Sequence, residues 1–428
     1  MSTQVQKSPD QLLIEKWDKV LNHPDIEPIR GFRKTAAVAR CLENMMTESA
    51  LNSQSLNEAN AIGSYPSDGT GVAKFDPVLM ALIRRAEPQL ISYDVCGVQP
   101  MKLPTGLIFA MRSKYGAQNS GVEAFYNEAD TDFSGTGTHA GSNPTSGTDT
   151  TGTGMSTTSM EAFSSVNEMS LTIERAAIEA KGRQLQAGYT RQLAQDLKRL
   201  HGLDAHTELA NMLSEEIVLE QNREIIRTMY YVAKPGAQIN VTTPGTFNLD
   251  TDANGRWSEE RFKGMLFAIE RDRNAIFQQT RRGRGNFIIC SADVASALAM
   301  TGKLSYAPDV AGSNKVNDGA MENTTYVGTI NGMKVYVDPY SAAVSANQFV
   351  LIGYKGKSEW DAGMFYCPYI PLERYDAVDP ANFQPKLAFM TRYALVNHPF
   401  AEGTTAAVGA LNAGTNVYFR LIKVTNLM

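Results

Sequence analysis

Residues Arg84–Gly106 read RRAEPQLISYDVCGVQPMKLPTG and are the most informative part of this chain. The apolar residues of 90–95 predict an extended run, and the residues around that run interrupt regular structure repeatedly. Proline lacks an N–H and fixes φ, whereas glycine permits positive φ, so the pattern predicts a shaped arm and not the interior of a helix or strand. The interruptions are Pro88, Cys96-Gly97, Pro100 and Pro104-Thr105-Gly106.

The composition is that of a protein with a sizeable core. Of 428 residues, 43% are hydrophobic and 20% are charged, and the net charge of −5 argues against a dedicated nucleic-acid binder. No apolar run approaches the roughly 18 residues that a membrane span needs. The N-terminus lacks an apolar signal core, so we expect the chain to be made and kept in a cytoplasm.

Residues that could carry chemistry do not form recognisable sites. The four cysteines are scattered without a CxxC pair, and Cys290 and Cys367 lie in apolar runs that predict buried thiols. None of the five histidines belongs to a nucleophile, zinc or general-base motif. The stretch 250–255 begins like a calcium loop, but the twelfth position holds Arg261 where a bidentate Glu is needed. The basic turn 281–285 lacks interleaved aromatic residues and predicts a solvated turn or an inter-subunit contact.

The periodicity of apolar residues predicts a mixture of helices and strands, and therefore an α+β organisation. Residues 130–159 are rich in Gly, Ser and Thr and lie between two strand-like flanks, which predicts a long two-stranded excursion with a flexible tip. The polar stretch 49–70 is expected to be exposed and flexible. The expected helices are 10–22, 32–46, 174–201, 204–231 and one that begins near Ser258; the expected strands include 287–290, 334–337, 349–352, 365–366 and 417–424.

Several blocks resemble the major capsid proteins of T4-like tailed bacteriophages, in the same order along the chain. They are GVQPMKLPTG, EAKGRQLQAGYTRQLAQDLKRLHGLDAHTEL (Glu179–Leu209), GRGNFII (Gly283–Ile289), DAGMFYCPYIPL (Asp361–Leu372) and DPANFQPKLAFMTRYALVNHPFAE (Asp379–Glu402). The resemblance implies an HK97-type capsid fold, with no enzymatic activity and no cofactor. It places the long spine helix of the peripheral domain near 179–201.

The resemblance also divides the chain into functional segments. It implies a removable N-terminal propeptide at 1–58, an N-terminal arm at 59–99, an E-loop at 100–173 with the connector 130–159, a peripheral domain at 174–284, an axial domain at 285–375 and a return to the peripheral domain at 376–428. The opening stretch would then route the arm along a neighbouring subunit.

Family members lose their N-terminal segment to a prohead protease, which cuts after Glu in a Leu/Ile-x-Glu pattern. Leu56-Asn57-Glu58 fits, so the resemblance predicts a cut between Glu58 and Ala59. The implied partners are further copies of the chain in hexamers and between capsomers, the vertex protein, an internal scaffolding protein, the protease, the portal at one vertex, and cementing or decoration proteins. The shell would assemble in the cytoplasm of a bacterial host and enclose double-stranded DNA without reading its sequence, and no membrane is involved.

One departure separates this chain from the T4 protein, which carries a folded module between the FSGxG-like block (Phe133–Gly137 here) and the spine. Here that interval is only the connector, so another clamp between neighbours is expected. Three alternatives stay open: the pentameric vertex protein of the same phages, an encapsulin-like compartment protein, and a hydrolase without a visible motif.

Overall fold

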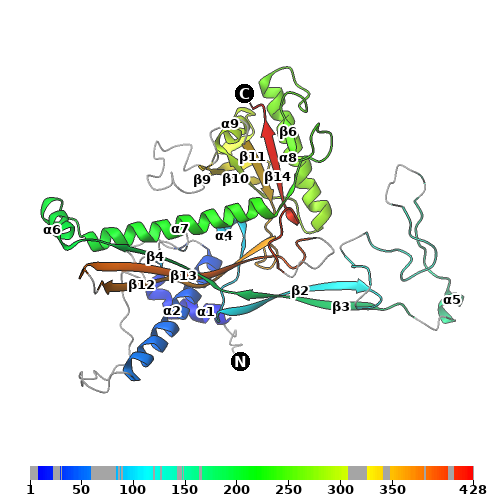
Figure 1. Cartoon of the computed structure of the whole chain (residues 1–428). Coiled ribbons are helices and arrows are strands. Elements are labelled where there is room, and N and C mark those ends of the chain that lie inside the picture. Colours follow the sequence, from blue (N-terminus) through cyan, green and yellow to red (C-terminus); the bar gives the residue numbers. More distant parts are fainter. Residues whose placement is uncertain are drawn as a thin grey trace.

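A computed structural model shows an elongated α+β molecule, in which the described residues form three sheets (Figure 1). The α+β prediction is confirmed. The structure describes residues 8–22, 29, 31–58 (of 48–58 the backbone only), 83–84, 87, 90–118, 121–125, 128–141, 147, 149–162, 166–306, 325–340, 348–379, 382–402 and 409–427. No helix in these ranges combines the length and apolar character that crossing a membrane would require.

The opening stretch is an internal connector of the chain's own core. Instead of an extended run, Ser92–Val95 form a short helix, α4, and Gly97–Val98 form strand β1, which pairs in parallel with Phe365–Tyr366. Tyr93 and Val95 are buried between helix α7 (Ala205–Val232) and both larger sheets. The expectation that this stretch runs along a neighbour is therefore wrong for 90–98. Gly97 is required there, because a Cβ would lie 2.6 Å from the carbonyl oxygen of Glu359.

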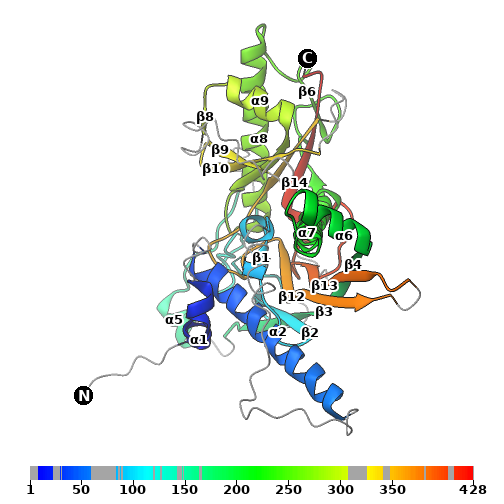
Figure 2. The same ribbon diagram turned by 90° about the vertical axis from the view of Figure 1, so that its left-hand side faces the viewer.

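Two N-terminal helices pack against one another and against the body of the chain. They are α1 (Pro9–Leu21) and α2 (Phe32–Glu58), which confirms both predicted helices. Ser8 and Gln11 form a capping box that starts α1. Helix α2 is longer than predicted and includes 49–58, the first part of the stretch expected to be exposed and flexible. Figure 2 shows both helices at the end of the molecule opposite the C-terminus.

A long two-stranded hairpin projects from the body, which confirms the predicted excursion (Figure 1). Strand β2 (Thr105–Tyr115) pairs with β3 (Met169–Glu179) in antiparallel register over eleven residue pairs. The connector beyond it contains the isolated bridges Thr136–Thr153 and Ala140–Thr150 and the short helix α5 (Thr157–Glu161).

The predicted helix 174–201 is wrong for most of its length. The chain runs from β3 into β4 (Lys181–Gly188), and only Arg191–Leu200 form a helix, α6. Sequence KGRQLQAG favours a helix by composition, but its Leu185 and Ala187 also alternate as a strand requires. Pairing of β4 with β13 (Pro385–Asn397) along eight residues satisfies the backbone groups of β4 and decides its conformation.

The long helix of this region is α7 (Ala205–Val232), so the helix predicted near 179–201 is misplaced; α7 is called the spine helix, or spine, below. Gly202, with φ of +69°, ends the preceding helical segment, because glycine takes this left-handed conformation without strain. Helix α7 lies against a sheet of order β1-β12-β13-β4, in which β12 spans Met364–Val378 and β13 spans Pro385–Asn397 (Figure 1).

The second large sheet has the order β5-β14-β11-β7-β10-β9-β8, with β6 beside β14. Its central strand β7 (Phe287–Ser291) is buried along its whole length, and helices α8 (Ser258–Thr280) and α9 (Ala292–Met300) pack against this sheet. The predicted strands and the helix near Ser258 are confirmed. The strands are β5 (Ala233–Pro235), β6 (Thr246–Asn248), β7 (Phe287–Ser291), β8 (Leu304–Tyr306), β9 (Thr325–Ile330), β10 (Met333–Asp338), β11 (Gln348–Gly353) and β14 (Asn416–Thr425).

These sheets do not follow the predicted boundary at 375. Strand β12 pairs with β13 in the sheet beside α7, although most of β12 falls in the range assigned to the axial domain. The closing strand β14 pairs with β11 in the other sheet, although its range was assigned to the peripheral domain. The chain thus passes from one sheet to the other after β11 and passes back before β14.

Candidate assembly surfaces

One face of the projecting hairpin is apolar and uncovered. Phe109 is 53% exposed and Met111 is 68% exposed, and the facing strand contributes Ile173 directly opposite Met111. Monomeric soluble proteins rarely leave such contiguous apolar surface in water. The face is therefore a candidate surface for contact with another protein molecule. Its residues are Leu107, Phe109, Met111, Met169, Leu171 and Ile173.

The opposite face is buried only at the base of the hairpin. There Ile108, Ala176 and Ile178 pack against Phe365 and other residues of the sheet beside α7. Because both strands leave that base in register, the exposed part is held at a fixed direction from the body.

A second candidate surface lies beneath the N-terminal helices. Trp17 and Leu42 belong to one apolar cluster with Leu213 of α7 and with Leu387 and Phe389 of β13. Both β13 side chains have no exposed surface. The first two helices thus complete a core of the body, and their loss would uncover it.

Asn44 fastens this N-terminal unit at its centre. Its side-chain amide donates to the carbonyl oxygens of Met101, 2.7 Å away, and Tyr369, 3.0 Å away. Asn44 is buried, and so are both residues whose carbonyls it satisfies. One amide therefore joins α2, the root of the hairpin and β12.

The predicted cleavage residues lie at the end of α2. Leu56 and Glu58 belong to its last helical residues, whereas Ala59 lies outside the described residues. The same Leu-x-Glu pattern occurs at Leu13-Ile14-Glu15 and at Leu213-Ser214-Glu215. Leu213 is buried in the cluster beneath α1 and α2, so a protease cannot reach that site in the folded chain.

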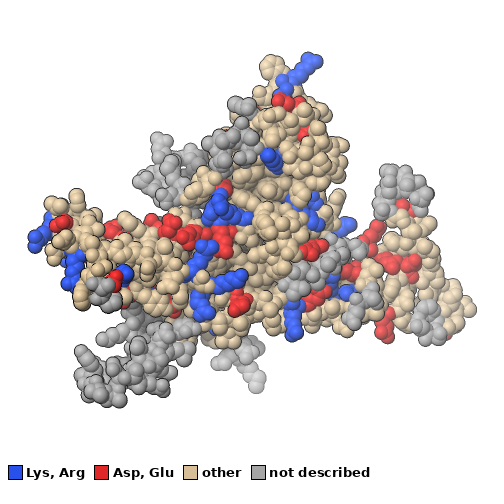
Figure 3. Space-filling model, in the orientation of Figure 1, with Lys and Arg blue, Asp and Glu red and all other residues tan. Residues whose placement is uncertain are grey.

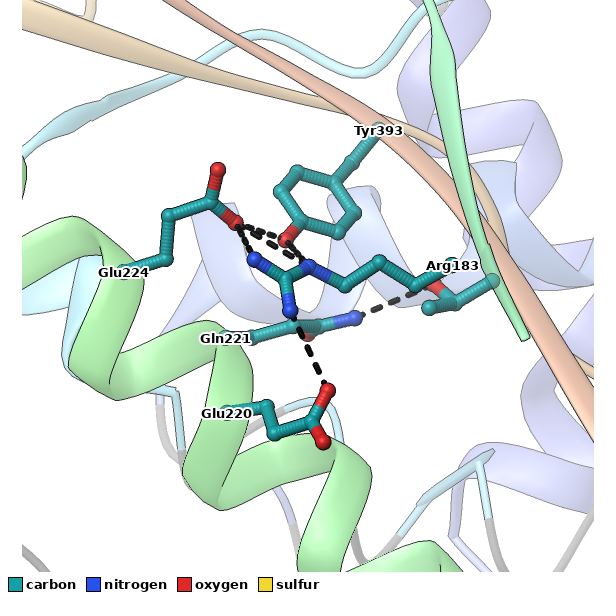
Figure 4. Close-up of polar contacts among 6 residues, drawn as sticks. Arg183, Glu220, Gln221, Glu224 and Tyr393 are labelled. Carbon is teal, nitrogen blue, oxygen red and sulfur yellow. Dashed lines mark hydrogen bonds and ion pairs between the residues drawn. The ribbon is translucent and has the colours of Figure 1, made fainter. Parts of the chain in front are cut away.

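An ionic network ties β4 to the spine (Figure 4). Arg183 donates to Glu224 of α7 at 2.7 Å and to Glu220 at 3.1 Å, and its Nε donates to the Tyr393 hydroxyl at 2.6 Å. Tyr393 in turn donates to Glu224. Burial, and after it the nearby Glu224 carboxylate, raise the pKa of Tyr393, so its hydroxyl stays protonated and able to donate.

Because β3 continues almost directly into β4, this network fixes the hairpin relative to α7. Gln221, one residue from Glu220, donates to Thr391 of β13 at 3.0 Å and adds a buried contact to the same junction.

The residues tested for other chemistry have structural partners. Cys290 and Cys367 are buried, as predicted, and burial raises the pKa of each thiol to about 12. The calcium-like loop is closed by an ion pair between Arg261 and Asp250. In the basic turn, Arg282 pairs with Asp361 at 3.3 Å.

Comparison with known proteins decides the family. The family model "Major capsid protein Gp23" matches residues 72–424. This chain belongs to the Gp23 major capsid protein family. It is 37% identical to the major capsid protein of Salmonella phage ViI, over 91% of this chain and 90% of that one. Identity to the major capsid protein of Vibrio phage KVP40 is 34%, over 97% of this chain and 100% of that one. Identity to the major capsid protein of Enterobacteria phage T4 is 33%, over 92% of this chain and 90% of that one.

As a major capsid protein, the chain is a building block of a tailed-phage head shell and not an enzyme. The "Capsid vertex protein" of phage T4 is also similar, at 26% identity over 55% of each chain. The solved capsid chain of phage XM1 shares 10% identity with a TM-score of 0.41, over 86% of this chain and 97% of that one. The solved capsid chain of Mycobacterium phage Bobi shares 12% identity with a TM-score of 0.42, over 87% of this chain and 98% of that one.

The capsid protein is shorter than some relatives. The alignment with the KVP40 protein runs over 521 positions, more than the 428 residues here, so that relative has segments without a counterpart in this chain. This agrees with the shortened connector noted in the sequence.

Sequence reasoning missed the Arg183 network and the Asn44 bridge. Glu220 and Glu224 are four residues apart on one helix, a like-charge spacing that is unfavourable unless a cation lies nearby. That spacing was the available signal. Nothing in the sequence marks Asn44, because its two partners are backbone carbonyls 57 and 325 residues away.

Proposed function

We propose that this capsid protein assembles as hexameric capsomers and is matured by a cut between Glu58 and Ala59. The observation that supports assembly is the uncovered apolar face of the β2–β3 hairpin. In the HK97-type scheme this hairpin is the E-loop, which lies on a neighbouring subunit. Burial of Phe109, Met111 and Ile173 there contributes about 1.5–3 kcal/mol per side chain.

Maturation would change the body as well as shorten it. The segment 1–58 corresponds to α1, the following linker and α2, and it carries the residues that cover Leu387 and Phe389. Once the chain is cut, the helices no longer share a chain with the body and can diffuse away. The effective concentration that favoured their binding is then lost, and the step becomes irreversible.

The proposed partners are those of a shell under construction: further copies of the chain, the pentameric vertex protein, an internal scaffold, the prohead protease and the portal. Cementing proteins are proposed as additional partners because the inserted module is lacking. The shell would form in the cytoplasm of a bacterial host and enclose double-stranded DNA without sequence-specific contacts.

Electron microscopy of the assembled protein tests the capsomer class, since hexamers are expected and pentamers alone would assign the chain to the vertex.

N-terminal sequencing of filled heads tests the cut, with Ala59 expected as the first residue. Glu58→Gln should block processing, whereas Glu15→Gln, in the matching pattern of α1, should leave it unchanged. Filled heads that retain residue 1 or 2 would contradict the maturation proposal.

A further inference from the structure

The distal part of the hairpin has an unusual charge distribution. Residues 116–168, here called the acidic loop, contain no Lys or Arg in a chain that has 40. They contain seven carboxylates: Glu123, Glu128, Asp130, Asp132, Asp149, Glu161 and Glu168. With seven carboxylates and no Lys or Arg, the loop has a formal net charge of −7, which is larger in magnitude than the net charge of −5 of the whole chain.

Most of these carboxylates have no cationic partner among the residues that the structure describes. Glu123 pairs with Arg112 at 3.5 Å, but the exposed Glu128, Asp149, Glu161 and Glu168 form no ion pair with a described residue. Asp130 and Asp132 lie so close together that hydrogen bonding to Asp132 raises the pKa of Asp130. The loop therefore repels itself, and an external cation would relieve that repulsion.

The acidic loop is also apolar in part, which distinguishes it from a merely solvated segment. Phe125 is 82% exposed, and Val122, Met160 and Val166 are exposed as well. A surface that is complementary to this loop must therefore present exposed cationic side chains beside exposed apolar side chains.

Helix α6 provides such a surface at the opposite end of the molecule. Its exposed Arg191, Lys198 and Arg199 outnumber its single acid, Asp196, and none of the three cations pairs with a described residue. Leu193, Leu197 and Leu200 follow the helical repeat, yet α6 buries no residue, and Leu200 is 77% exposed. Figure 3 shows Lys and Arg gathered at this end and Asp and Glu at the other.

We propose that the acidic loop of one subunit binds α6 of a second copy. The contact rests on the proposed shell function and names the surface that replaces the missing module as a clamp. It must be intermolecular, because the loop and α6 lie at opposite ends of one chain (Figure 1). The exposed turn with Arg281 and Arg284 is a poorer acceptor, since it offers cations without a comparable stripe of leucines.

Charge reversal in the full chain tests this contact. Asp149→Lys, Glu161→Lys and Glu168→Lys together should raise the protein concentration at which shells form by about ten-fold. Arg191→Glu, Lys198→Glu and Arg199→Glu together should do the same. Combining both sets should restore assembly to within about three-fold of wild type. Arg281→Glu with Arg284→Glu is the matched control and should leave assembly unchanged.

A contact measurement separates this inference from the shell proposal. Chains with Thr158→Cys and chains with Gln195→Cys are mixed and treated with a short thiol-specific crosslinker, to which the buried native cysteines are inaccessible. We expect the mixed dimer to exceed either same-variant dimer at least ten-fold. If the mixed dimer forms but no shells do, the hexamer proposal is overturned and the α6 contact stands. If shells form but the mixed dimer does not, the α6 contact is overturned. A combined charge-reversal variant that assembles as poorly as its two parent variants would overturn the α6 contact as well. Reversed loops that assemble normally but lose a separate basic protein would assign the acidic loop to a cementing partner instead.

Discussion

Replacing Asn44 by alanine should loosen the N-terminal helices while the rest of the fold stays intact. The substitution leaves the carbonyls of Met101 and Tyr369 without their donor in a buried place. An unsatisfied buried polar group costs about 1–3 kcal/mol, so two cost about 2–6 kcal/mol. The loss of stability in Asn44→Ala cannot exceed the free energy with which the helices dock on the body. Once the helices detach, water reaches both carbonyls and removes the penalty.

Hydrogen exchange of α2 amides measures this loss directly. A lower value of about 2 kcal/mol corresponds to exchange about 30-fold faster at Val38 and Leu42, provided that these amides exchange by detachment of the helix. Amides near Ile269 of α8 lie in a separate core and serve as the internal reference. Gln195→Ala removes an exposed helical amide side chain and is the matched control.

Unchanged exchange at Val38 and Leu42 in Asn44→Ala would refute this reasoning. It would mean that water already satisfies the two carbonyls, or that α2 opens without breaking these bonds. Equal acceleration at α2 and α8 would also contradict it, since the substitution would then act on global stability and not on the docked helices.

Three further predictions concern other parts of the fold. Phe389→Ala should lower the free energy of unfolding by about 3–5 kcal/mol in urea titration, whereas Phe383→Ala, at an exposed position, should change it by less than about 0.5 kcal/mol. In a double-mutant cycle, Arg183→Met and Glu224→Gln should show a coupling of about 1 kcal/mol that weakens with salt, because the pair is partly exposed. Burial raises the pKa of Glu87 from 4.5 to about 7. Its protonated carboxyl therefore contributes to the free energy of unfolding below pH 4.5, and this contribution is lost as the pH rises to about 7. Glu87→Gln should remove that part of the pH dependence of the free energy of unfolding.

Elements with their own local signals were predictable from the sequence. The apolar periodicity of α1 and of the first part of α2, and the alternating flanks of the connector, each specify structure within a few residues. For the same reason the central strands β7, β10 and β11 were found in nearly their true positions.

The errors arose where distant partners decide the conformation. Segment 181–188 is rich in helix-favouring residues, but β13, about two hundred residues later, provides its hydrogen-bonding partners. Residues 92–95 turn inward because Tyr93 and Val95 fill a core that α7 and both sheets create. The sheet partners of β12 and β14 likewise depend on chain crossings that no local pattern encodes.

The parts that carry shell function follow from these long-range contacts. The hairpin receives its direction from β4, and β4 receives its position from the Arg183 network on α7. The N-terminal helices reach the same junction through Asn44, which holds the hairpin root at Met101. A cut after Glu58 would therefore remove one of two fastenings of the hairpin and leave the other. A shell built in this way can change the hairpin's freedom during maturation without releasing it from the spine.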